Sequence, residues 1–463
     1  MSFNSLQYLV FLPLTVLIFH RLSNKYKPYF LLIVSYLFYL CTHILSPFIL
    51  LFTTIGGYFF AIKISETISE KDKKSLLFTG ILLNIIILLS CREIFKSLIP
   101  AIGVSFFTFQ NISYLIDCYL GIIQPERNFL YYALYLSFFP KLIQGPIERA
   151  SNLIPQLKHM KNTICEYETL RGGVQLFFWG MFKKIFIADN IAPVITSILN
   201  DINGTSGPVL LIITYLYAIQ IYCDFSGYTD MSLGSARLFG INLTNNFNYP
   251  YFSPSTQDFW RRWHITLSGW ILDYIFKPLS MKGRNYGNYG VITALIITFV
   301  ICGIWHGLTL NYICWGLYHG ILISLSFLTY KKWEKFCKKY KINQGIIYII
   351  NVFITFNLVC FSWLFFMTKT LSDVWLILSK NITTLLNFLA IHSFDTGIST
   401  CFIIVIAIFF FIEVLQAKFN IKAYFERQNV FIRWAGYYIM IMVIILWGNY
   451  GSKETLEFMY FRF

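Results

Sequence analysis

The chain has 463 residues, of which 57% are hydrophobic, 19% aromatic and only 13% charged. Soluble domains average about 45–50% apolar and about 25% charged residues, so this composition excludes an ordinary soluble domain. The formal net charge is +15, and many of its basic residues stand in short polar segments between apolar runs, which indicates membrane topology more than a nucleic-acid partner.

Long apolar runs follow one another along the chain. A helix that spans a bilayer needs about 20 mostly apolar residues, and that length predicts about 11–13 spans here. The runs are 6–20, 28–44, 46–63, 75–91, 98–120, 129–147, 208–223, 291–303, 307–329, 345–367, 398–415 and 431–448. We therefore predict an all-α polytopic membrane protein, a single domain over residues 1–463, in which re-entrant and interfacial amphipathic helices accompany the membrane helices.

The basic residues predict which ends of these runs face the cytoplasm. No basic residue precedes the first run, and Arg21, Lys25 and Lys27 follow it, which indicates a retained first helix with its N-terminus outside. The strongest basic segment, "KKWEKFCKKYK" at 331–341, is then predicted to be cytoplasmic, and the C-terminus to be outside. The positive charge also favours contact with anionic membrane lipids, and we expect no nucleic-acid partner.

The segment 224–290 mixes charged and aromatic residues and is longer than an ordinary loop between two helices. Within it, "SPSTQDFWRRWHITLSGWILDYIF" at 253–276 starts with a capping pair, Ser255 and Asp258. Aromatic and apolar residues then recur at spacings of three and four. The stripe consists of Trp260, Trp263, His264, Leu267, Trp270, Ile271 and Tyr274. We predict one amphipathic helix that lies in the membrane interface or plugs the bundle.

Common catalytic patterns are absent from the sequence. It has no His-Glu-x-x-His pair, no phosphate-binding Gly-x-x-x-x-Gly-Lys-Ser/Thr loop and no Gly-x-Ser-x-Gly elbow. The ten cysteines are scattered, without a Cys-x-x-Cys pair, and no residues have the spacing of metal ligands, so we expect no metal site. Ionisable residues within membrane segments are functional candidates by default, which leaves histidines and isolated carboxylates.

Two histidines lie in the apolar stretch "GIWHGLTLNYICWGLYHG" at 303–320. On one unbroken helix, His306 and His319 would be separated by about 20 Å of rise and about 140° of rotation. They could not then act on one substrate atom, so one would be functional and the other structural, unless the helix breaks at 309–311. We favour a structural role for His319, whereas both a functional and a structural role stay open for His306.

Other candidates are weaker when the residues are considered alone. His264, on the predicted amphipathic helix, is more typical of an interfacial residue than of a catalyst. Asp224 and Asp230 follow the apolar run 208–223, where they either line a polar cavity or cap a helix.

Several ordered motifs together resemble one known family. They are "FFPKLIQGPIERASNLIPQL" at 138–157, "GMFKKIFIADNIAP" at 180–193, the segment 224–279, the stretch 303–320 and the terminal "FMYFRF" at 458–463. On these the chain resembles the membrane-bound O-acyltransferases, and within them the bacterial alginate O-acetylation type. One departure is "KPLSMKGRNYG" at 277–287, which replaces a more glycine-rich pattern of the family and leaves the local fold of that loop open.

The resemblance implies an O-acyltransferase that moves an acyl group, with acetyl favoured over another short acyl group, from a cytosolic thioester across the membrane for O-acetylation of an extracellular or periplasmic polysaccharide. It implies acetyl-CoA as the donor, with no permanently bound cofactor, and a bacterial plasma (inner) membrane location. It also implies a separate extracytoplasmic acyl-handling O-acetyltransferase as partner. We expect the aromatic and basic tail 458–463, or the segment 380–397, to dock that partner.

The resemblance also implies roles for particular residues, in a catalytic region of about 224–320. His306 matches the principal catalytic histidine, His264 its partner, and His319 a position of secondary importance. Neutral imidazole suits the removal of a hydroxyl proton near neutral pH, and His264 would orient the acceptor or stabilise the oxyanion. The further substrate-binding or secondary residues that we expect are Asp224, Asp230, Trp260, Arg261, Arg262 and Trp305.

Three other functions remain as alternatives. The first is D-alanyl transfer to teichoic acid, the second a membrane transporter whose histidines relay protons, and the third a lipid or sterol acyltransferase. The absence of visible repeats and the predicted amphipathic plug disfavour a transporter. Acyl transfer by the purified protein in detergent separates the enzyme from the transporter.

Overall fold

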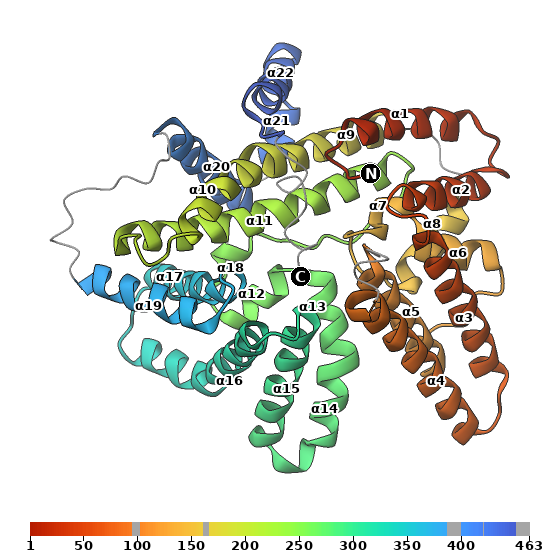
Figure 1. The fold of residues 1–463 in the computed structure, drawn as a ribbon, viewed down its shortest axis with the longest axis horizontal. Coiled ribbons are helices and arrows are strands. Elements are labelled where there is room, and N and C mark those ends of the chain that lie inside the picture. The colour runs from red at the N-terminus through yellow and green to blue at the C-terminus, as the bar shows by residue number, and fades with distance from the viewer. Residues whose placement is uncertain (95–101, 161–165, 387–399, 420, 451–463) are drawn as a thin grey trace. The chain divides into compact units, whose positions relative to one another are not determined.

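The computed structural model describes residues 1–94, 102–160, 166–386, 400–419 and 421–450. Over these ranges the regular structure is helical, apart from one isolated antiparallel bridge between Phe247 and Trp263. The prediction of an all-α fold is therefore confirmed. The chain folds as two compact units, the first containing 1–181 with 227–245 and the second 182–226 with 246–463. Figure 1 labels the helices.

The first unit takes the N-terminal helices. Their bounds are α1 Leu6–Arg21, α2 Lys27–Leu40, α3 Ser46–Glu66, α4 Glu70–Leu89, η1 Ser90–Ile94, α5 Val104–Tyr119, α6 Phe129–Ser137, α7 Phe139–Leu142, α8 Ala150–His159 and α9 Tyr167–Met181. Helices α3, α4 and α5 pack side by side (Figure 1). Between them, Asn111 donates to the carbonyl of Thr53 (3.1 Å) and to the side-chain oxygen of Asn84 (3.0 Å), and accepts from the Tyr132 hydroxyl (2.6 Å). These buried amides satisfy one another and join apolar helices.

The second unit contains the remaining helices, including α11 up to residue 226; the rest of α11 belongs to the first unit. Their bounds are η3 Phe182–Ala188, α10 Asp189–Leu199, α11 Gly207–Arg237, η4 Pro250–Phe252, α12 Thr256–Arg262, α13 Ile265–Ile271, η5 Leu272–Phe276, α14 Lys277–Lys282, η6 Arg284–Tyr286, α15 Asn288–His306, α16 Leu310–Lys339, α17 Gln344–Ser362, α18 Leu364–Met367, α19 Leu371–Leu386, α20 Thr400–Lys418, α21 Ile421–Glu426 and α22 Val430–Trp447.

Seven helices within the described ranges are long and apolar enough to cross a membrane. They are Ser46–Glu66, Glu70–Arg92, Gly207–Arg237, Asn288–His306, Leu310–Lys339, Gln344–Met367 and Val430–Trp447. Helices α1 and α2 are apolar but shorter. The apolar run 129–147 differs from a predicted span, because Pro140 follows the end of α6 and the run divides into α6 and α7, each too short to cross a bilayer. The total of 11–13 spans stays a prediction.

Helices α15 and α16 form an antiparallel hairpin whose backbones approach closely (Figure 1). A Cβ atom on Gly303 of α15 would collide with the carbonyl oxygen of Tyr312, and one on Gly316 of α16 with the carbonyl oxygen of Phe299. Small residues at such positions permit close backbone contact between membrane helices. The glycines of the stretch 303–320 therefore set the spacing of the hairpin.

Replacing Gly316 with alanine should loosen this hairpin. The added methyl group meets rigid backbone, and overpacking of this kind costs about 1–3 kcal/mol. The matched control is Gly269→Ala in α13, where an added Cβ meets nothing within 4 Å. We expect G316A to lower the melting temperature in detergent and G269A to leave it unchanged or raise it slightly. Equal melting of G316A and wild type would contradict the close packing.

Candidate active site

The segment 253–276 is helical but interrupted, so the prediction of one continuous amphipathic helix is wrong. Its start is as predicted, because the Ser255 hydroxyl accepts from the backbone N–H of Asp258 (3.1 Å). Helix α12 ends at Arg262, and α13 begins only at Ile265. The interruption has a tertiary cause, since the segment 246–248 pairs with the chain at this point.

Two backbone hydrogen bonds form that pairing. Asn248 donates to the carbonyl of Arg262 (3.0 Å), and Ile265 donates to the carbonyl of Asn246 (3.0 Å). Between them His264 adopts a left-handed conformation, with φ 44° and ψ 54°. A residue with a side chain is uncommon there, and such strain persists where the surrounding structure holds it. The stripe of aromatic residues is therefore bent at His264.

Asn246 determines how His264 presents its ring. The side-chain oxygen of Asn246 accepts from the backbone N–H (3.1 Å) and the hydroxyl (2.6 Å) of Thr266. A backbone N–H can only donate, so the Asn246 atom is the oxygen, and Nδ1 of His264, 3.4 Å away, carries the proton. The lone pair of the neutral ring is then on Nε2. Burial lowers the pKa of His264 to about 3, so the ring is neutral at physiological pH.

His306 is the last residue of α15 and is only 4% exposed. Aromatic rings from α15, α16 and α18 surround it. The distances between ring centroids are 4.6 Å to Trp305, 5.2 Å to Trp315, 5.0 Å to Phe366 and 6.3 Å to Tyr312. The predicted principal histidine therefore lies in a dense aromatic enclosure built from three helices.

The helix between the two histidines of this stretch is broken. Helix α15 ends at His306 and α16 begins at Leu310, so the separation expected for one helix does not apply. The ring centroid of His319 instead lies 5.0 Å from that of Trp315, the same ring that His306 contacts. The break falls just before the predicted position 309–311, and the hairpin brings both histidines to one tryptophan.

Tryptophans link this cluster to His264. The ring centroid of Trp363 lies 6.3 Å from that of Trp315 and 5.0 Å from that of Trp263, the residue before His264. From α12, Trp260 donates its indole N–H to Nδ1 of His319 (3.2 Å). Of the predicted secondary residues, Trp260 and Trp305 therefore contact the histidines directly.

The predicted arginines have different surroundings. Arg261 is exposed on α12. Arg262 is partly buried and forms an ion pair with Asp258 one turn earlier (2.8 Å). A salt bridge of this exposure contributes little to stability, and it holds the arginine along α12.

Asp224 does not cap a helix, because α11 continues unbroken through Asp224 and Asp230. Asp224 accepts from the buried amine of Lys184 (2.6 Å), which also pairs with Asp189 (2.7 Å). Burial opposes the charge of Lys184, but the two carboxylates outweigh it and raise the pKa of the amine. Asp230 belongs to the part of α11 in the first unit.

Sequence reasoning missed this ion cluster. Lys184 lies in η3, a π-helix within the motif 180–193, and π-helices are frequent at functional sites. The only local signal was a lysine pair, Lys183 and Lys184, inside an apolar motif with Asp189 five residues later. Lys183 is buried too and donates to the hydroxyl of Ser226 (3.0 Å).

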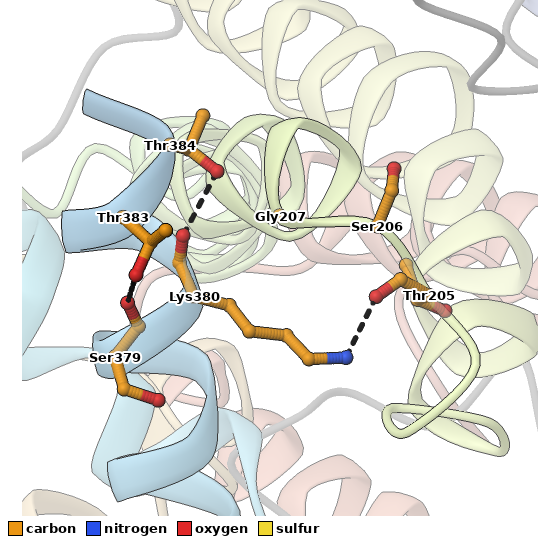
Figure 2. A pocket seen from close by; sticks show the side chains of 7 residues that line it. All are labelled: Thr205, Ser206, Gly207, Ser379, Lys380, Thr383 and Thr384. Atoms are coloured by element: carbon orange, nitrogen blue, oxygen red, sulfur yellow. Dashed lines mark hydrogen bonds between the residues drawn. The ribbon is translucent and has the colours of Figure 1, made fainter. Parts of the chain in front are cut away.

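A pocket of about 270 Å³ lies elsewhere in the second unit, between the start of α11 and α19 (Figure 2). Its lining residues are Thr205, Ser206, Gly207, Ser379, Lys380, Thr383 and Thr384. The Lys380 amine donates to the carbonyls of Ile202 (3.1 Å), Asn203 (2.8 Å) and Thr205 (2.9 Å). An ammonium group has three N–H donors, and these three bonds hold the loop 202–205 against α19. The pocket contains none of the predicted site residues.

The buried neutral state of His264 makes stability depend on pH. The pKa of His264 is about 3 in the folded chain against an ordinary value of 6.5, so between these values the unfolded chain binds a proton that the folded chain does not. Unfolding free energy should therefore fall with decreasing pH below 6.5, by up to about 2 kcal/mol at pH 5. Melting temperatures in detergent at pH 6.5 and at pH 5 measure this loss of stability. His264→Asn, which tolerates the left-handed conformation and cannot titrate, should show a shallower fall; an equally steep one would contradict the assignment.

Comparison with known proteins gives the family. The sequence profile of the MBOAT, membrane-bound O-acyltransferase family matches residues 123–368. A probable alginate O-acetylase of Pseudomonas aeruginosa is 30% identical over 396 residues, covering 79% of this chain and 72% of the relative. A peptidoglycan O-acetyltransferase of Helicobacter pylori is 33% identical, covering 74% and 71%. A teichoic acid D-alanyltransferase of Bacillus subtilis is 32% identical, covering 59% and 70%. The chain belongs to the membrane-bound O-acyltransferase family and is a multi-pass membrane enzyme that transfers acyl groups.

Proposed function

We propose that the chain transfers an acetyl group from a cytosolic thioester, acetyl-CoA, towards hydroxyl groups of a glycan outside the bacterial plasma membrane. The observation that carries this is the cluster of buried histidines around Trp315 and Trp363. The relatives named for O-acetylation of alginate and of peptidoglycan support acetyl as the acyl group and a polysaccharide as the acceptor.

His306 acts as the general base in this proposal. Its imidazole takes the proton of the attacking hydroxyl, the new C–O bond forms, and the C–S bond of the thioester breaks. The proton then passes from the imidazolium to the thiolate that leaves, so the histidine ends the cycle neutral. The enclosure of Trp305, Trp315 and Phe366 keeps water from competing with the hydroxyl.

His264 orients the acceptor. With the proton on Nδ1 facing Asn246, its Nε2 carries a lone pair and accepts a hydrogen bond from a hydroxyl. Of the two roles expected from the resemblance, this tautomer supports orientation of the acceptor over stabilisation of an oxyanion. The left-handed backbone at His264 supports this role, because strained conformations of this kind are frequent at functional sites.

D-alanyl transfer to teichoic acid is the second candidate. Relatives with that name cover 59% and 60% of this chain, against 79% and 74% for the two named acetylating relatives. The longer match supports acetyl transfer. Membership of an acyltransferase family argues against the proton-relay transporter, and the glycan-directed names of the relatives support a glycan over a lipid or sterol acceptor.

The central test is His306→Ala in purified protein in detergent. With radiolabelled acetyl-CoA and a soluble glycan fragment, we expect acetyl ester formation to fall by about 10²–10⁴-fold, because the base is lost. The matched control is His159→Ala, which removes an exposed histidine of α8 and should leave both turnover and melting unchanged. Turnover of H306A close to wild type would exclude His306 as the base.

A polymer is too large to enter a helical bundle, so we further propose an extracytoplasmic acyl-handling protein as partner. The segments expected to dock it, 458–463 and most of 380–397, lie outside the described residues. Deleting 458–463 should reduce O-acetylation of cell-surface glycan while leaving acetyl-CoA turnover in detergent intact. Normal glycan acetylation in cells that carry the truncated chain would exclude docking by the tail.

A further inference from the structure

The hydrogen bond between Trp260 and His319 fixes the protonation of the His319 ring. An indole N–H only donates, so Nδ1 of His319, which lies 3.2 Å from it, must be an unprotonated acceptor. A neutral imidazole then carries its single proton on Nε2. This is the opposite of His264, whose Nδ1 carries the proton. The two histidines therefore present different chemical groups, a lone pair on one and an N–H donor on the other.

The Nε2 donor of His319 is fully buried. The residue is 0% exposed, and Nε2 has no hydrogen-bond partner within the described part of the chain. A buried donor without an acceptor costs about 1–3 kcal/mol. The rings of Trp260, Trp315 and Phe299 around the imidazole carry no acceptor oxygen. The Tyr318 ring, with its centroid 5.5 Å from that of His319, has a hydroxyl, which donates to the carbonyl of Leu358. An oxygen atom of a ligand would remove that cost.

His319 and His306 contact the same tryptophan, which places both imidazoles in one aromatic cluster. The ring centroids of His306 and His319 lie 5.2 Å and 5.0 Å from that of Trp315. The two histidines come from adjacent helices of the glycine-spaced hairpin, which fixes their relative position. Donors that are fixed before the reaction stabilise developing charge without reorganisation.

We propose that His319 is a catalytic residue that donates its Nε2–H to the carbonyl oxygen of the acyl thioester. The proposal rests on the proposed acyl transfer and assigns a residue for which a purely structural role was favoured from the sequence. As the acceptor oxygen bonds to the carbonyl carbon, the carbonyl oxygen gains negative charge, and the Nε2–H stabilises it. When the C–S bond breaks, the carbonyl reforms and the thiolate receives the hydroxyl proton through His306. The proton on His319 stays on Nε2 throughout, with Trp260 as the positioning residue.

Two substitutions separate donation from packing. His319→Asn places an amide oxygen near the position of Nδ1, where it still accepts from Trp260, but it removes the donor at Nε2. His319→Gln places an amide N–H near the position of Nε2 and removes the acceptor near Trp260. We expect H319N to reduce acetyl transfer by about 10²–10³-fold at nearly unchanged melting temperature, as for loss of one oxyanion donor. We expect H319Q to retain transfer within about tenfold of wild type.

The outcomes decide between donation and a structural role. Equal transfer by H319N and wild type, or equal losses in H319N and H319Q, would overturn the proposal. If H319N does not fold, H319Q still tests it, because a loss as large as that of H306A would overturn it. Nitrogen-15 NMR of histidine-labelled wild type, with H319Q used to assign the signal, must show the proton on Nε2 of His319; a proton on Nδ1 would overturn it. Failure of wild type to acetylate any hydroxyl would instead reject the proposed function and leave the NMR result unaffected.

Discussion

The close approach of α15 and α16 is the contact on which the site depends. Gly303 and Gly316 let the two backbones meet, and the chain reverses between His306 and Leu310. This reversal turns a separation of 13 residues in the sequence into contact with one shared tryptophan. A bulkier residue at either glycine would separate the helices and with them the two imidazoles. The arrangement of the two histidines therefore depends on the small size of Gly303 and Gly316.

Three buried polar groups in the second unit have specific partners. Asn246 faces His264, Trp260 faces His319, and the buried Lys184 lies between two carboxylates. Because removal from water penalises an unpaired polar atom, each of these partners determines the protonation and orientation of the group beside it. The same physics that stabilises the fold thereby gives His264 and His319 complementary chemical character. In the proposed mechanism, His306 is the neutral base, His264 the hydrogen-bond acceptor and His319 the hydrogen-bond donor.

Local patterns in the sequence predicted the features that have local causes. Apolar composition predicted the helical membrane fold, and the spacing of Ser255 and Asp258 predicted the start of α12. The break at His264 was not predictable, because it arises from pairing with 246–248, a segment separated from it by the whole of α12. The partner of Lys184 was hidden for the same reason, since Asp224 lies 40 residues further along the chain.

The histidines themselves were identified from residue types and from the family resemblance, yet their relation to one another was not. The alternatives for His306 and His319 depended on whether one helix was broken, and the sequence alone left that open. The apolar run 129–147 is a second example: its hydropathy predicted one membrane span, but hydropathy cannot show that α6 ends before Pro140. Tertiary contacts and chain reversals therefore account for what composition and periodicity could not supply.

The most direct measurement is a structure of the protein with a non-reactive acetyl-CoA analogue in which a methylene group replaces the thioester sulfur. We expect the ketone carbon to lie against His306, with the ketone oxygen within hydrogen-bonding distance of Nε2 of His319. Binding of the acyl end away from the histidines, for example among the hydroxyl groups of the pocket beside Lys380 (Figure 2), would contradict it.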